Sequence, residues 1–129
     1  MPLSLVQRGI FPNDSCTNIR GIGLESTILF AREGASVLMA DVNPITLETG
    51  LRRAREFAPE GKIEAFTVDV SKETQVEAMV AEAEKLFGGG VDVIFNNAGI
   101  MHPEDDNATN TEERIWYQIS KECILISGI

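Results

Sequence analysis

Short apolar runs alternate with amphipathic stretches through the middle of the chain, and this alternation predicts a series of strands and helices. Three apolar runs, each followed by Asp or Asn, predict strands over residues 35–40, 63–68 and 91–95. Two of these runs are almost continuously apolar, which is typical of strands that are covered on both faces of a sheet. Strands that alternate with helical patterns indicate βαβ units, so the pattern predicts an α/β fold with a parallel sheet.

Helical patterns fill the segments between these runs, and capping residues mark their ends. Gly34 suits the position just past the first helix, and Asn43 with Pro44 supplies an N-cap and a first helical residue for the second. Ser71 predicts the N-cap of the third helix. The predicted helices cover residues 23–33, 44–58, 71–87 and a last segment that begins near Thr111.

Apolar stripes at helical spacing run along three of these helices. We interpret the stripes as the faces that pack against the sheet, because apolar residues at this spacing share one side of a helix. The stripes comprise Leu47, Leu51, Ala54 and Ala58, then Val76, Met79, Val80, Ala83, Leu86 and Phe87, and finally Ile115, Trp116 and Ile119.

The first strand does not follow the same pattern. A parallel sheet requires a strand before Gly21, but residues 8–15 contain Pro12 and a polar stretch. Proline removes a donor from the ladder of hydrogen bonds, so these residues do not suit a central strand. The alternative is a strand over Leu3–Val6, or extending as far as Phe11, followed by a long loop.

Composition and charge narrow the classes of partner. The chain has 129 residues, 20 of them acidic and 11 basic, so its net charge is −9. Nucleic acids and anionic membrane surfaces select clustered Lys and Arg, so we expect neither as a partner. No apolar run approaches the ~18–20 residues that span a bilayer, and the first residues lack a signal-peptide pattern. Two cysteines are too few for a disulfide framework, so we expect a cytoplasmic protein.

A glycine pair opens the first predicted helix. Gly21, Ile22 and Gly23 form a G-x-G sequence, which lets a pyrophosphate approach the backbone and the N-terminal N–H groups of the helix. By itself the pair is weak support for such a site, because a turn also accounts for two glycines.

Asp41 follows the next strand and is a candidate for binding a ribose. It lies 20 residues after Gly21, the spacing of the acidic residue that accepts hydrogen bonds from an adenosine ribose. Its charge would repel a 2′-phosphate, which favours NAD over NADP. Arg20 is a competing signal, since a guanidinium pairs with phosphate. The alternative role for Asp41 is to stabilise the start of the helix at Pro44.

The two later strands also end in polar residues. Asp69 and Val70 follow the strand at 63–68, at a position suited to an adenine edge, although Asp69 equally suits the capping of the next helix. Asn96-Asn-Ala-Gly99 follows the third strand, and its small residues leave room for a ligand. Open α/β sheets bind ligands at this carboxyl edge.

In this order and spacing, the motifs resemble the N-terminal, cofactor-binding half of a short-chain dehydrogenase/reductase over residues 21–116. The resemblance implies a partial Rossmann-type domain, a doubly wound parallel sheet that binds NAD, or less favourably NADP. It also implies hydride transfer to or from a small carbonyl or alcohol substrate in full-length relatives. The cofactor-binding residues that it implies are Gly21, Ile22, Gly23, Asp41, Asp69, Val70, Asn96, Ala98 and Gly99.

The catalytic residues of that family do not carry over to this chain. Tyr117 and Lys121 have the family's Y-x-x-x-K spacing, but only 17 residues separate Gly99 from Tyr117. A crossover to a single parallel strand already takes ~12 residues, so this interval is too short for the family's intervening elements. Glu104 stands where a family serine is expected. We therefore assign no catalytic or metal-binding residue and expect Tyr117 and Lys121 on the surface of the last helix.

The ends of the chain depart from the family pattern, and Thr17 stands in place of the family's first glycine. We interpret residues 1–20 as a divergent segment, 21–116 as an incomplete dinucleotide-binding domain and 117–129 as a divergent tail. These features predict a truncated oxidoreductase fragment. The alternative is a truncated nucleotide-binding or interaction fragment without turnover of its own. A methyltransferase-like nucleotide site is the third possibility, which Asn96-Asn-Ala-Gly99 disfavours.

Overall fold

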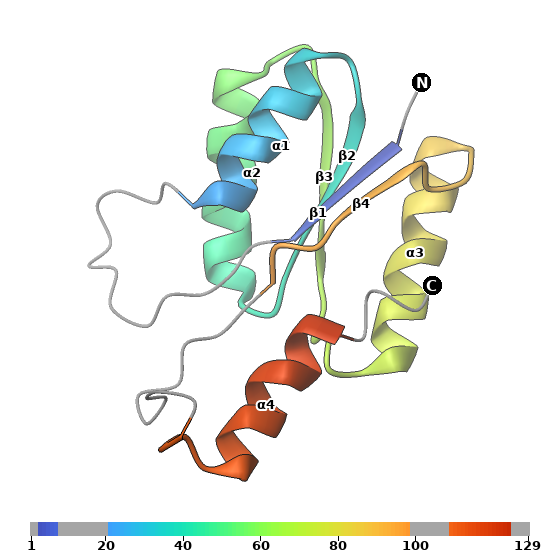
Figure 1. Ribbon diagram of the computed structural model, residues 1–129. Coiled ribbons are helices and arrows are strands. Elements are labelled where there is room, and N and C mark those ends of the chain that lie inside the picture. Colours follow the sequence, from blue (N-terminus) through green and yellow to red (C-terminus); the bar gives the residue numbers. More distant parts are fainter. Residues whose placement is uncertain (1–2, 8–20, 99–108, 125–129) are drawn as a thin grey trace.

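The computed structural model describes residues 3–7, 21–98 and 109–124 (Figure 1). Strands and helices alternate along these ranges, and the predicted strands and the four helices recur with ends that differ by at most two residues. The elements in chain order are β1 (Leu3–Gln7), α1 (Ile22–Arg32), β2 (Ser36–Asp41), α2 (Pro44–Phe57), β3 (Lys62–Thr67), α3 (Glu73–Phe87), β4 (Val93–Phe95) and α4 (Glu113–Ile124).

The strands form one parallel sheet in the order β3-β2-β1-β4. In the register of the sheet, Leu5 of β1 lies opposite Leu38 of β2 on one side and Ile94 of β4 on the other. Helices α1 and α2 cover one face, and α3 covers the opposite face (Figure 1). The chain thus winds outward from β1 to β3 and then returns past β1 to β4. This arrangement confirms the predicted doubly wound α/β fold.

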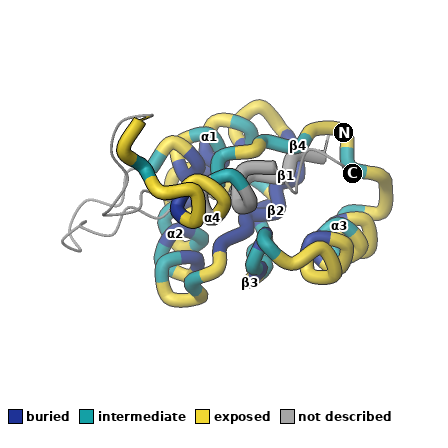
Figure 2. The backbone as a smooth tube through the Cα atoms, turned by 60° about the horizontal axis from the view of Figure 1, so that its bottom comes forward, coloured by how far each residue is buried: buried dark blue, intermediate teal, exposed yellow. Residues whose placement is uncertain are grey.

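Strand β2 is the centre of the core, since all six of its residues are buried. Val37 and Met39 pack in one apolar cluster with residues of α1 and α2, whereas Leu38 and Ala40 pack in a second cluster with residues of α3. Successive side chains of a strand point to opposite faces, so one continuous apolar run supplies both clusters. Figure 2 shows this strand in the colour of buried residues between the helices.

The first strand corresponds to the alternative position predicted from sequence. Leu3–Gln7 pairs in parallel with both β2 and β4, and so fills the place in the sheet that residues 8–15 do not suit. Pro12 and its polar neighbours lie outside the described residues, as does Thr17. The strand between β2 and β4 therefore comes from the segment 1–20.

Helix ends confirm two predicted caps and correct a third. The Asn43 side chain accepts hydrogen bonds from the N–H groups of Ile45 (3.0 Å) and Thr46 (3.4 Å). Gly34, just past α1, has a φ of 88°, in the left-handed region that glycine favours.

The predicted N-cap of α3 is wrong. Lys72 occupies the N-cap position and makes no capping hydrogen bond through its side chain. The Ser71 hydroxyl instead donates to Asp69 Oδ1 at 2.6 Å. A carboxylate is a stronger acceptor than a neutral group, and it draws this hydroxyl back toward the end of β3.

Two residues of the predicted apolar stripes lie on the surface instead. Leu86 is 44% exposed and Trp116 is 64% exposed, whereas Ile115 is 1% exposed. Adjacent helical residues point about 100° apart, so Ile115 and Trp116 cannot both face the core. Leu86 lies in the last turn of α3, at the rim of the layer. Among the described helices none is long and apolar enough to span a bilayer.

Candidate cofactor site

The N-terminus of α1 presents backbone donors at the carboxyl edge of the sheet. Gly21 is the N-cap in an extended conformation, without a side-chain cap, and its carbonyl accepts from the N–H of Glu25 at 3.1 Å. The first N–H groups of a helix have no partner within the helix, and the helix dipole makes this end positive. Gly23 is buried, and Ile22 is 70% exposed. This turn can bind an anion through its backbone.

A buried hydroxyl supports that turn. The Thr27 side chain is 0% exposed and its Oγ1 donates to the carbonyl oxygen of Gly23 at 2.9 Å. The sequence patterns did not single out Thr27, although a threonine four residues after a helix-opening glycine is the signal for such a bond.

Asp41, the last residue of β2, is buried and 1% exposed. Its Oδ1 accepts a hydrogen bond from the N–H of Asn43 at 2.8 Å. The predicted alternative, in which Asp41 stabilises the start of α2, is thus realised through Asn43. That role does not exclude binding of a ribose, because a carboxylate has a second oxygen and several lone pairs.

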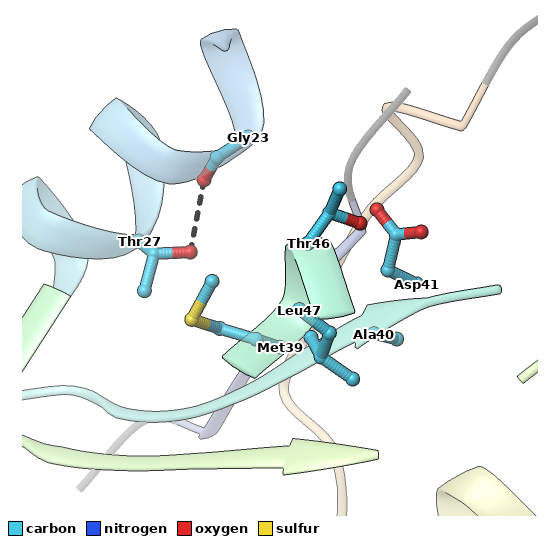
Figure 3. A pocket seen from close by; sticks show the side chains of 7 residues that line it. All are labelled: Gly23, Thr27, Met39, Ala40, Asp41, Thr46 and Leu47. Atoms are coloured by element: carbon cyan, nitrogen blue, oxygen red, sulfur yellow. Dashed lines mark hydrogen bonds between the residues drawn. The ribbon is translucent and has the colours of Figure 1, made fainter. Parts of the chain in front are cut away.

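Gly23 and Asp41, predicted from different motifs, line the same cavity (Figure 3). Its volume is about 10 Å³, and the other lining residues are Thr27, Met39, Ala40, Thr46 and Leu47. A space of about this size holds one water molecule. The cavity is therefore too small to enclose a ribose, and the Asp41 side chain beside it is 1% exposed.

The end of β3 is organised differently. Asp69 Oδ1 accepts from both the N–H (3.0 Å) and the hydroxyl of Ser71, and the Asp69 N–H donates to Gln75 Oε1 at 2.8 Å. Asp69 thus stabilises the turn that leads to α3 and does not cap the helix as predicted, because its carboxylate accepts from Ser71 and Lys72 occupies the N-cap position. Val70 is 4% exposed and packs in the cluster beneath α3, so its side chain belongs to the core.

The end of β4 presents its amides at the same edge of the sheet. Asn96 is exposed and Asn97 is half-buried, while Ala98 packs against the cluster beneath α3. Gly99 lies outside the described residues. Strands β1 and β4 are neighbours, and the chain leaves β1 toward β2 on the other side. Ligands of open α/β sheets bind at such a switch point.

The Y-x-x-x-K spacing of Tyr117 and Lys121 falls on α4. Tyr117 is 68% exposed, which confirms that it lies on the helix surface. The side chain of Lys121 is outside the described part of the molecule. In that part, no group of three or more His, Cys, Asp or Glu residues is placed to hold a metal ion.

The polar groups at this edge of the sheet are of the types that bind a nicotinamide dinucleotide. Backbone N–H groups and the positive end of α1 suit phosphates, and the Asp41 carboxylate suits ribose hydroxyls. The two asparagines after β4 add polar groups at the neighbouring strand. Such a cofactor would supply or accept a hydride, and these residues would hold and orient it.

Comparison with known proteins agrees with this description. The family model described as enoyl-(acyl carrier protein) reductase matches residues 16–122. An uncharacterised oxidoreductase of Bacillus subtilis is 41% identical over 98 residues, which are 74% of this chain and 37% of that protein.

Solved structures show the same fold. A short-chain oxidoreductase of Pseudomonas aeruginosa with an atypical catalytic centre superposes with a TM-score of 0.78 at 22% identity, over 96% of this chain and 43% of that one. An actinorhodin polyketide ketoreductase with NADPH superposes with a TM-score of 0.72 at 26% identity. The match covers 93% of this chain and 41% of the ketoreductase.

This chain therefore spans less than half the length of these relatives. The family match covers most of the chain, from residue 16 to residue 122. With the doubly wound sheet and the residues at its carboxyl edge, it shows that this chain belongs to the short-chain dehydrogenase/reductase family of oxidoreductases.

Proposed function

We propose that residues 21–116, with β1 completing the sheet, form a dinucleotide-binding domain that prefers NAD to NADP. One observation carries this proposal: Asp41 and Gly23, from separate motifs, line one cavity at the carboxyl edge of the sheet. In the whole protein this domain would serve NAD-dependent hydride transfer on a small carbonyl or alcohol compound.

Each strand end has a proposed part in binding. Gly21, Ile22 and Gly23 line the pyrophosphate, and Asp41 holds the adenosine ribose. Asp69 and Val70 flank the adenine with their backbone, because their side chains are engaged in the turn and in the core. The residues proposed to lie along the second ribose are Asn96, Ala98 and Gly99.

The preference for NAD rests on the charge of Asp41. A 2′-phosphate would bring a second anion close to a carboxylate that is 1% exposed, and like charges repel strongly where water screens them least. The ketoreductase with NADPH shows that relatives of this fold also accept the phosphorylated cofactor. The charge at position 41 is therefore the variable to test.

Titration of NAD and NADP against the chain and its Asp41→Asn variant tests this proposal. Asparagine retains an oxygen that can accept from the Asn43 N–H, so the variant removes the charge and keeps the local turn. We expect the ratio of the NADP to the NAD dissociation constant to fall by about tenfold, the effect of ~1.4 kcal/mol.

Asp92→Asn is the matched control, because Asp92 precedes β4 at the amino edge of the sheet. It should leave the ratio unchanged. An unaltered ratio in Asp41→Asn, or tighter binding of NADP than NAD by the unmodified chain, would contradict the assigned role of Asp41.

A further inference from the structure

A second cavity lies between α1 and α2, outside the cofactor site. Its volume is about 130 Å³, compared with about 10 Å³ beside Asp41. Arg32 lies in the last turn of α1 and Phe57 ends α2, so the cavity reaches the helix ends opposite the carboxyl edge of the sheet. The residues that line it are Glu25, Ile28, Arg32, Arg53 and Phe57.

Phe57 holds both arginines in place. The Nε–H of Arg32 donates to the Phe57 carbonyl oxygen at 2.9 Å, and the guanidinium carbon of Arg53 lies 5.7 Å from the centroid of the Phe57 ring. A planar guanidinium that is already oriented loses less conformational entropy when it binds an anion. The two side chains are thus prepared for a ligand that approaches between the helices.

Neither arginine forms an ion pair with a carboxylate within the described part of the chain. Arg55, Lys85 and Arg114 form ion pairs with glutamates there, but Arg32 and Arg53 do not. The negative end of each helix dipole accounts for a cation in the last turn of a helix. It does not account for two guanidinium groups, from two helices, on one cavity.

The chemistry of the lining selects a small carboxylate with an apolar body. Guanidinium groups bind carboxylates through paired hydrogen bonds, and the Phe57 ring with Ile28 offers an apolar surface. Glu25 lies seven residues before Arg32, about 10 Å away along the helix, and disfavours a second negative charge there. Two guanidinium groups and one carboxylate leave a local charge of +1 on a chain of net charge −9.

We propose that this cavity is a binding site for a small organic monocarboxylate. The site does not depend on the proposed cofactor role, because none of its lining residues belongs to the carboxyl edge that would hold the dinucleotide. A ligand between α1 and α2 would brace the same two helices whose opposite ends flank Asp41.

Titration of benzoate into the isotope-labelled 129-residue chain, followed by NMR, tests the site. We expect saturable shifts at the backbone signals of Ile28 and Phe57 and at the Nε–H of Arg32, with a dissociation constant on the order of 1 mM. Benzamide has the same shape without the charge and should not saturate these signals. Equal binding of benzamide, or shifts that chloride reproduces at the same ionic strength, would overturn the proposal.

Two arginine variants separate this site from a general charge effect. Arg53→Gln should weaken benzoate binding by about tenfold, because it removes one charge-assisted hydrogen-bonding group. Arg52→Gln is the matched control, since Arg52 is exposed, adjacent in sequence and absent from the lining. Equal weakening by both variants would contradict the site.

A conservative substitution guards against loss of fold. Arg53→Lys keeps the charge and loses the planar fork, so it should weaken binding by about threefold, with backbone signals outside α1 and α2 unchanged. Unchanged affinity in this variant would show that the guanidinium of Arg53 does not contact the ligand.

Discussion

The ends of β2 and β3 differ in how the chain uses one aspartate. Asp41 and Asp69 each come at the end of a strand, at the same edge of the sheet and before a helix. At β2, Asn43 caps the following helix, and Asp41 is buried beside the cavity at α1. At β3, Asp69 is half-buried and its carboxylate holds Ser71.

The two turns therefore differ in which residue stabilises the start of the next helix, and this affects whether the aspartate is available to a ligand. In the β2–α2 turn a separate residue, Asn43, caps the helix, and the aspartate accepts one N–H of the turn. In the β3–α3 turn the aspartate accepts two hydrogen bonds from Ser71, and Lys72 at the N-cap makes no capping bond. Asp41 is thus the stronger of the two candidates for binding a ligand through its side chain.

The largest expected effect is on stability at the buried member of the pair. Asp41→Ala should lower the free energy of unfolding by about 2–3 kcal/mol, because it removes a side chain that is 1% exposed and leaves the part-buried Asn43 N–H without its acceptor. Asp69→Ala should cost about 1 kcal/mol, since Asp69 is itself only half-buried. Urea unfolding of both variants measures the difference. An equal or larger loss of unfolding free energy in Asp69→Ala would contradict the proposed difference between the two turns.

A smaller effect, opposite in sign, is expected at the N-terminus of α3. Lys72 has φ −112° and ψ 104°, close to the −97° and 110° of Asn43. Lys72→Asn should therefore supply the missing cap and raise the free energy of unfolding by about 0.5–1 kcal/mol. Lys72→Gln is the control for charge alone. Equal stabilisation by glutamine would show that the cap is not the cause.

The smallest effect is expected at Tyr117. Its side chain is 68% exposed on α4, so Tyr117→Phe should change neither the affinity for NAD nor any rate of NADH formation by more than about twofold. Calorimetric titration and the absorbance of NADH measure the two quantities. Abolition of NADH formation by this substitution would instead identify Tyr117 as the acid–base residue.

Local signals predicted much of the fold and of the candidate site. Asn43-Pro44 and Gly34 marked helix ends because capping depends on residues within one turn. The apolar run of β2 predicted burial on both faces for the same local reason. The predicted cap at Ser71 was wrong because Asp69, two residues away, accepts the hydrogen bond of its hydroxyl. The predicted burial of Trp116 was wrong because the apolar stripe did not define which side of α4 faces the core.

The sequence by itself determined the order of strands and helices, the family and the residue types at the carboxyl edge. These follow from periodicity and from short motifs whose hydrogen bonds close within a few residues. Tertiary structure decided that Leu3–Gln7 lies between β2 and β4, that Gly23 and Asp41 share a cavity, and that Arg32 and Arg53 line a second one. Each of these joins segments distant in the chain, which only the packing of the sheet and its helices brings together.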